Sequence, residues 1–119
     1  MSTQLLFGRD IQGYTADAPQ FPTDIYTATL AANTGDSVTV PSNFQTWIMY
    51  VRIEPTGTCW VSRNGTAAVP AGGTFAAAVS ELIAGTIEYR RTVYAGDVID
   101  FITADTTCDI EVAFQAVIA

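Results

Sequence analysis

Turn-forming sequences recur at short intervals along this chain, and they limit the length of any regular element between them. They lie at residues 33–36, 41–43, 54–57, 64–65, 70–73, 95–97 and 104–107. Each contains a residue that tolerates a positive φ angle, fixes φ or caps a turn. Gaps of about 8 to 12 residues between turns are typical of short antiparallel strands. We therefore expect an all-β fold, a two-sheet antiparallel β-sandwich or jelly roll of about eight strands.

The segments between the turns are rich in β-branched and aromatic residues, which favour strands. The predicted strands are 25–31, 37–40, 46–53, 58–62, 66–69, 86–94, 98–103 and 109–118. The segment 46–53 carries apolar residues on both faces, with Trp47 and Met49 on one and Ile48 and Tyr50 on the other. Such a strand is expected at the centre of a sheet that is covered on both sides.

Two features of the middle of the chain are interpreted separately. Asn-Gly at 64–65 is a strong hairpin signal and predicts that 58–62 pairs with 66–69. The segment 74–84 spaces its apolar residues as a helix does, and Gly85 is a suitable helix stop. We expect either a short helix or an irregular crossover there.

The first 24 residues differ in kind, because glycines and prolines interrupt every regular period among their apolar side chains. We expect residues 1–24 to form an extended N-terminal arm and 25–119 to form the β-sandwich domain. The arm either lies across its own sheets or docks on a neighbouring subunit. The expected core of the domain comprises Ile25, Leu30, Ile48, Tyr50, Val61, Ile87, Phe101, Val112 and Phe114.

The charge composition excludes many functions. The chain has 12 acidic residues against five basic ones, all arginines, and a net charge of −7, with no histidine or lysine. This balance offers no electrostatic footprint for nucleic acid or for an anionic membrane surface. Ser-His-Asp triads, histidine-bound zinc and Schiff bases all require an absent side chain. We therefore expect a non-enzymatic protein without a cofactor.

Four aspartates crowd into the last quarter of the chain, namely Asp97, Asp100, Asp105 and Asp109. Calcium sites draw oxygens from such acidic loops, but Asp97 and Asp105 occupy turns in which aspartate caps its own backbone. Turn chemistry is the favoured explanation, and no metal site is predicted. A pair of catalytic carboxylates cannot be selected among the twelve acidic residues.

Asp100 alternates with apolar residues along its predicted strand, so it shares their face of the sheet. A buried carboxylate without a partner costs several kcal/mol, so Arg90 or Arg91 is the expected counter-ion. The pair is either internal or formed across a subunit interface.

The start of the chain bears on the redox state of its two cysteines. The N-terminus lacks the basic and apolar regions of a secretory signal, so we expect synthesis in a reducing cytoplasm. Cys59 and Cys108 are then expected as free buried thiols, with a disulfide as the alternative.

Five aromatic residues either pack in the core or form a sugar-binding face. These are Trp47, Tyr50, Trp60, Tyr89 and Tyr94.

Two runs of sequence, CWVSRNGTAAVPAGGTF at 59–75 and VYAGDVIDFITADTTCDIEVAF at 93–114, resemble small structural proteins of tailed bacteriophages. The similarity is to head decoration and other accessory virion proteins. It implies a virion protein that binds capsid subunits and itself, often as a trimer, and it implies no catalytic residue. A surface poor in charge is consistent with packing in an assembly.

We therefore expect a homo-oligomeric decoration or cement protein that bridges capsid subunits of a phage head. The alternative is a carbohydrate-binding or host-surface-binding β-sandwich module. The residues expected at interfaces are Leu5, Leu6, Phe7 and Ile11 in the arm, and Arg90, Arg91 and Asp100 at a subunit seam.

Overall fold

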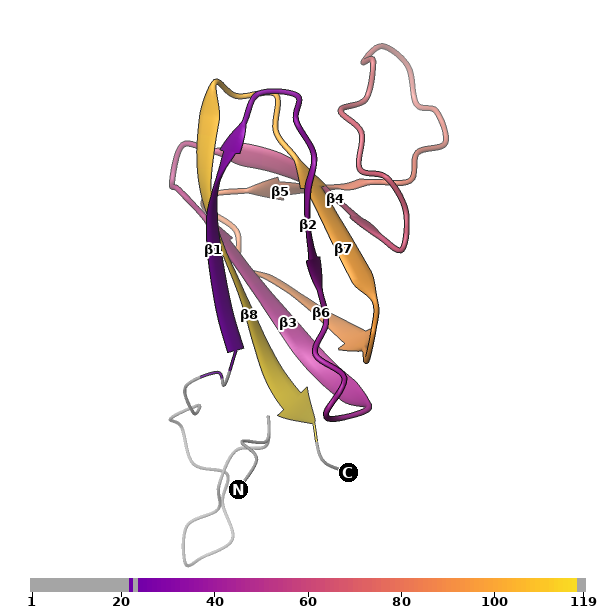
Figure 1. Cartoon of the computed structure of the whole chain (residues 1–119). Coiled ribbons are helices and arrows are strands. Elements are labelled where there is room, and N and C mark those ends of the chain that lie inside the picture. The colour runs from indigo at the N-terminus through magenta and orange to yellow at the C-terminus, as the bar shows by residue number, and fades with distance from the viewer. Residues whose placement is uncertain (1–21, 23, 118–119) are drawn as a thin grey trace, which may run out of the picture.

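The computed structural model describes residue 22 and residues 24–117, which form eight strands in two antiparallel four-stranded sheets. The first sheet has the order β1 (Asp24–Ala31), β8 (Thr107–Val117), β3 (Thr46–Ile53) and β6 (Tyr89–Tyr94). The second has the order β2 (Asp36–Thr39), β7 (Val98–Ile102), β4 (Thr58–Arg63) and β5 (Glu81–Ala84). The two sheets pack face to face as a sandwich (Figure 1).

The strand order is that of a jelly roll. Most connections carry the chain from one sheet to the other, and β4 and β5 are the sole consecutive strands that neighbour each other in one sheet of the described structure. Two Greek keys wound in this way make an eight-stranded jelly roll. The described residues contain no helix, and the all-β prediction is confirmed.

The central strand of the first sheet lies where its sequence predicts. β3 spans Thr46–Ile53 and pairs with β8 on one side and β6 on the other. Trp47 and Met49 point between the sheets and are buried, whereas Ile48 and Tyr50 lie on the outer face and are half-buried. The prediction of a central strand is confirmed, but its second face is covered less completely than the sequence suggested.

The core lies between the inner faces of the two sheets. Five of the expected core residues are buried there: Leu30, Val61, Phe101, Val112 and Phe114. The other four lie outside this core: Ile48 and Tyr50 are half-buried on the outer face of β3, Ile25 is 53% exposed and Ile87 is 65% exposed. Ile25 lies on the outer face of β1, since the alternation of that strand turns its neighbours Tyr26 and Ala28 inward; Ile87 lies in the turn between β5 and β6.

The Asn-Gly hairpin is absent from the described structure. Asn64 does adopt the left-handed conformation, with φ at 54°. Its backbone N–H donates to the carbonyl of Val98 (2.7 Å), and its side-chain oxygen accepts from the Val98 N–H (2.8 Å). These bonds tie the end of β4 to β7, so residues 66–69 leave the sheet instead of folding back on β4. The prediction of a turn at Asn64 is confirmed, but the predicted pairing of 58–62 with 66–69 was wrong, because β4 pairs with β7 and β5.

The segment 74–84 is not a helix. Residues 74–80 are irregular, and the segment ends in the short strand β5. Gly85 follows because a Cβ atom at this position would clash with the backbone of Glu54 and Pro55. The glycine is therefore required by a close approach of two chain segments and does not stop a helix.

Candidate functional site

The residues predicted to form interfaces are scattered through the structure. Leu5, Leu6, Phe7 and Ile11 lie outside the described residues. Arg90 lies on the outer face of the first sheet, where it approaches Glu88 (Nε–Oε1 3.4 Å) and the ring of Tyr50 (6.0 Å to the centroid). Its side chain is 57% exposed, so this ion pair contributes little to stability.

Arg91 connects the two sheets at one side of the sandwich, where it lines a hollow of about 270 Å³. Its guanidinium contacts the carboxylate of Glu81 (Nη2–Oε2 2.6 Å) and lies over the ring of Tyr89 (4.2 Å), while the Tyr89 hydroxyl donates to Glu81 (3.1 Å). Arg91 and Tyr89 belong to β6 and Glu81 to β5, so the cluster joins the two sheets. The hydrogen bond from Arg91 lowers the pKa of Glu81, and burial is the main cause that raises the pKa of Tyr89 to about 12.

Asp100 is buried, but no arginine among residues 24–117 is its ion-pair partner. Its carboxylate accepts a hydrogen bond from the backbone N–H of Ala67 (Oδ2–N 2.7 Å), and both residues are at most 9% exposed. The internal salt bridge to Arg90 or Arg91 was predicted wrongly, because Arg91 pairs with Glu81 and Arg90 with Glu88. The carboxylate instead anchors the start of the loop that follows β4.

This loop, residues 64–80, is the most unusual feature of the surface, and we call it the apolar loop. It contains no charged residue, and it stands away from the sandwich between β4 and β5 (Figure 1). Phe75 in this loop is fully exposed, and Val79 is 73% exposed. Irregular loops longer than about 12–15 residues are uncommon in compact domains and are usually functional. Exposed apolar side chains gathered on such a loop mark an interaction site.

The apolar loop is held at both ends, so its exposure is a property of the fold. Asp100 binds it at Ala67, and the hydroxyl of Ser80 accepts from the N–H of Ala68 (3.1 Å). Its inner side and Trp60 of β4 enclose a hollow of about 660 Å³. No charged side chain lines this hollow among the described residues.

We predict that Asp100→Ala releases the apolar loop. The N–H of Ala67 would lose its buried acceptor, at a cost of about 1–3 kcal/mol. Limited proteolysis with elastase, which cleaves beside small apolar residues, should then cut within 68–79 several-fold faster than in the wild type. Asp109→Ala is the matched control, because that carboxylate accepts an exposed hydrogen bond from Thr29 on the other sheet. Equal cleavage of the two variants would contradict the anchoring role.

A second apolar feature lies at the opposite side of the sandwich, between the edge strands β1 and β2. Here the sheets separate and leave a cleft of about 190 Å³. Its apolar lining residues are Tyr26, Ala28, Leu30, Val38, Phe101, Ile110 and Val112. Tyr26 is 43% exposed although its ring contacts that of Phe114 (5.9 Å). This cleft and the cluster of Arg91, Glu81 and Tyr89 therefore lie at opposite sides of the sandwich.

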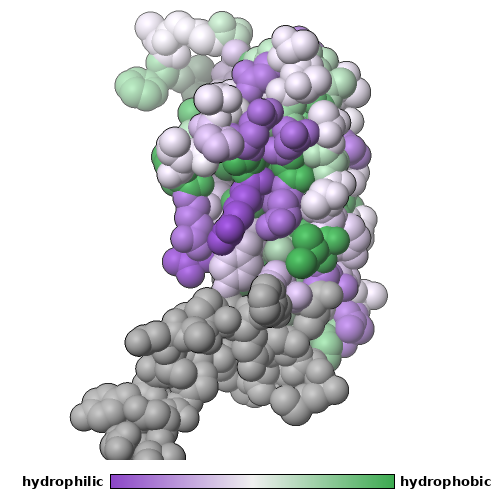
Figure 2. Space-filling model, turned by 90° about the vertical axis from the view of Figure 1, so that its left-hand side faces the viewer, coloured by the Kyte–Doolittle hydropathy of each residue, from purple (hydrophilic) through white to green (hydrophobic). Residues whose placement is uncertain are grey.

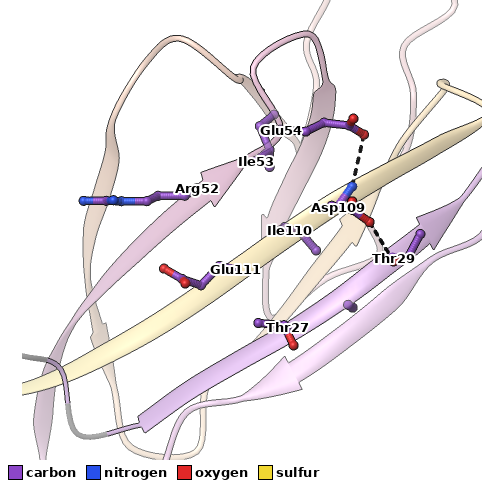
Figure 3. A pocket seen from close by; sticks show the side chains of 9 residues that line it. Thr27, Thr29, Arg52, Ile53, Glu54, Asp109, Ile110 and Glu111 are labelled. Carbon is purple, nitrogen blue, oxygen red and sulfur yellow. Dashed lines mark hydrogen bonds between the residues drawn. The ribbon is translucent and has the colours of Figure 1, made fainter.

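A polar depression lies on the outer face of the first sheet. Figure 2, which views the left-hand side of Figure 1, shows hydrophilic side chains gathered in a band across this face. Figure 3 shows that Glu54 accepts from the backbone N–H of Asp109 (3.1 Å) and that the Thr29 hydroxyl donates to Asp109 (2.7 Å). Both carboxylates therefore form hydrogen bonds within the first sheet and its adjoining turn. No cluster of potential metal ligands occurs within residues 24–117.

The aromatic residues do not form a common platform. Trp47 and Tyr89 are buried, and Tyr50 and Trp60 are half-buried on opposite sheets. Tyr94 is 43% exposed, with the guanidinium of Arg63 over its ring (5.4 Å). Two of the five aromatic candidates line hollows that the apolar loop also lines: Trp60 shares one with most of the loop, and Tyr89 shares another with Val79.

Both cysteines are free and buried, as expected from the sequence. Burial is the largest cause that raises the pKa of Cys59 to about 12 and that of Cys108 to about 11, and the carboxylate of Asp105 acts in the same direction on both. The thiolate is the reactive form. We therefore expect dithionitrobenzoate at pH 8 to label neither thiol in the folded protein within minutes and both at once in 6 M guanidinium. Rapid labelling of either cysteine in the native state would contradict this burial.

Three comparisons with known proteins add no assignment. No protein-family model, curated protein or solved structure matches the chain. The described residues include no helix of the length and hydropathy needed to cross a membrane. The arguments for function therefore rest on the residues and surfaces described above.

Proposed function

We propose that this chain is a non-enzymatic structural protein of a tailed-phage virion, a head decoration or cement protein that self-associates and bridges capsid subunits. The observation that carries the proposal is the apolar loop, an uncharged segment with a fully exposed phenylalanine on an anchored base. A lone protein gains nothing from holding such a segment in water, whereas an assembling protein buries it.

Composition and fold support the same proposal. Charged residues make up 14% of the chain, against about 25% of all residues in a typical soluble domain. Jelly rolls recur among viral capsid proteins, although a fold by itself does not specify a function. At about 25 cal/mol per Å², burying roughly 800 Å² per partner corresponds to on the order of 10 kcal/mol before the costs of association.

The experiment is quantitative mass spectrometry of purified virions of the phage that encodes the chain, with light scattering of the isolated protein. We expect the chain in the particle at a fixed ratio to the major capsid protein, and a mass above that of a monomer in solution. Its absence from purified particles would refute the assignment to a virion. A monomer at every concentration would refute self-association.

Carbohydrate binding is the second candidate, and one observation favours it. Trp60 lines the hollow of about 660 Å³ beneath the apolar loop, and jelly rolls also occur in lectins. The hollow is mainly apolar, with Thr74 and Ser80 as its hydroxyl side chains, and Ser80 already accepts from Ala68. A glycan array, followed by titration of the wild type and of Trp60→Ala, distinguishes the candidates. Saturable binding that is lost in the variant would favour the sugar-binding function.

A further inference from the structure

We propose that the apolar loop of one copy inserts Phe75 into the cleft between β1 and β2 of a second copy. This inference deepens the proposed function and rests on its self-association. The apolar loop is the donor surface, and the cleft lined by Tyr26, Ala28 and Val38 is the acceptor.

The two surfaces match in size and in chemistry. The cleft measures about 190 Å³, which is room for one aromatic side chain. Its walls are mostly aliphatic and aromatic carbon, and the loop brings Phe75 without a charged neighbour. An aromatic anchor in a desolvated apolar pocket is the typical centre of a protein interface.

The net charge restricts where two copies can touch. Each copy carries a formal charge of −7, so identical copies repel one another over most of their surfaces. The loop is uncharged, and Asp36 is the single charged residue among those that line the cleft. Contact through these two surfaces brings copies together where the repulsion is weakest.

Within one copy the loop does not fill the cleft. Phe75 is fully exposed and lines the hollow beside Trp60, and no residue of the apolar loop lines the cleft between β1 and β2. The Phe75 that fills the cleft therefore comes from another copy. Figure 1 shows the loop projecting outward from the sandwich, away from β1. A chain with donor and acceptor on different sides makes a head-to-tail contact, and such contacts close into rings when the rotation permits. A trimer is one such ring.

The first test compares the association of full-length variants by light scattering and sedimentation. Phe75→Ser should raise the dissociation constant for self-association roughly 30-fold, as expected for loss of an interface anchor. Phe75→Leu, which keeps an apolar side chain, should retain most of the affinity. An oligomer unchanged by Phe75→Ser would overturn the loop insertion while leaving the proposed self-association intact. A wild type that is monomeric throughout would overturn both.

The second test identifies the acceptor by disulfide trapping with oxidised glutathione. The native thiols are buried with raised pKa values, so they do not compete with introduced cysteines. Protein carrying Phe75→Cys is mixed with protein carrying Ala28→Cys, and a cross-linked dimer of the two is expected. Thr92→Cys is the control, because Thr92 is exposed on the outer face of β6, away from the cleft. Equal cross-linking at residues 28 and 92, or none at residue 28, would overturn the assignment of the cleft.

Discussion

Phe114→Ala should destabilise the fold by about 3–5 kcal/mol, the largest effect of any single substitution considered for this protein. Phe114 is completely buried in β8, between β1 and β3. Its ring contacts those of Trp47 (6.5 Å) and Tyr26 (5.9 Å) edge to face. Truncation removes these contacts and leaves a cavity that the paired strands on both sides cannot close.

Urea unfolding followed by tryptophan fluorescence measures this loss. Because small domains have about 5–15 kcal/mol of stability in total, the variant should show an early transition or partial unfolding without denaturant. Ile87→Ala is the control, since Ile87 is 65% exposed in a turn and its truncation should change stability by less than about 0.5 kcal/mol. A change below about 1 kcal/mol for Phe114→Ala would contradict the packing between the sheets.

Asp97→Asn should lower the free energy of unfolding by about 2–3 kcal/mol at neutral pH, the second-largest effect that we expect. The Asp97 carboxylate lies in the turn between β6 and β7 and accepts from Arg63 Nε (2.7 Å), Asn64 Nδ2 (3.0 Å) and the Tyr94 N–H (2.9 Å). It therefore joins the end of β4, the end of β6 and the start of β7. Asparagine keeps the size of the side chain but replaces one accepting oxygen with a donor.

The same carboxylate predicts a loss of stability in acid. Burial by itself would raise the pKa of Asp97, but the hydrogen bonds from Arg63 and Asn64 outweigh it and hold the pKa below that of an ordinary aspartate. The unfolded chain then binds a proton more readily than the folded one, so the stabilisation is complete above the unfolded pKa. It is lost as the pH falls through the lower, folded pKa.

Thermal melts between pH 2 and pH 7 test this dependence. The difference between wild type and Asp97→Asn should be constant above about pH 5 and shrink below about pH 4. Glu88→Gln is the control, because Glu88 forms an exposed ion pair with Arg90 that is worth less than about 1 kcal/mol. A difference that stays constant down to pH 2 would show that the charge of Asp97 does not stabilise the fold.

Only part of the candidate site could be predicted from the sequence. The low charge and the absence of histidine and lysine predicted a non-enzymatic protein that binds other proteins through its surface. The segment 74–84 was predicted as a short helix or an irregular crossover, but the projecting apolar loop at 64–80 was missed. The available signal was the uncharged stretch between Arg63 and Glu81, which spans too many residues for a hairpin turn. The cleft between β1 and β2 had no local signal, because its walls come from four strands.

The amino-acid sequence by itself determined the strand class, most strand positions and the sites of the turns. Local sequence is enough to predict the alternation of buried and exposed residues along β3 and β8 and the positive φ of Asn64. These features depend only on residues close by in the chain. The tertiary structure alone decided which strands pair, which face of β1 points inward, and that Asp100 binds the Ala67 N–H and neither Arg90 nor Arg91. Those outcomes depend on residues distant along the chain, because pairing and burial are settled by the packing of both sheets together.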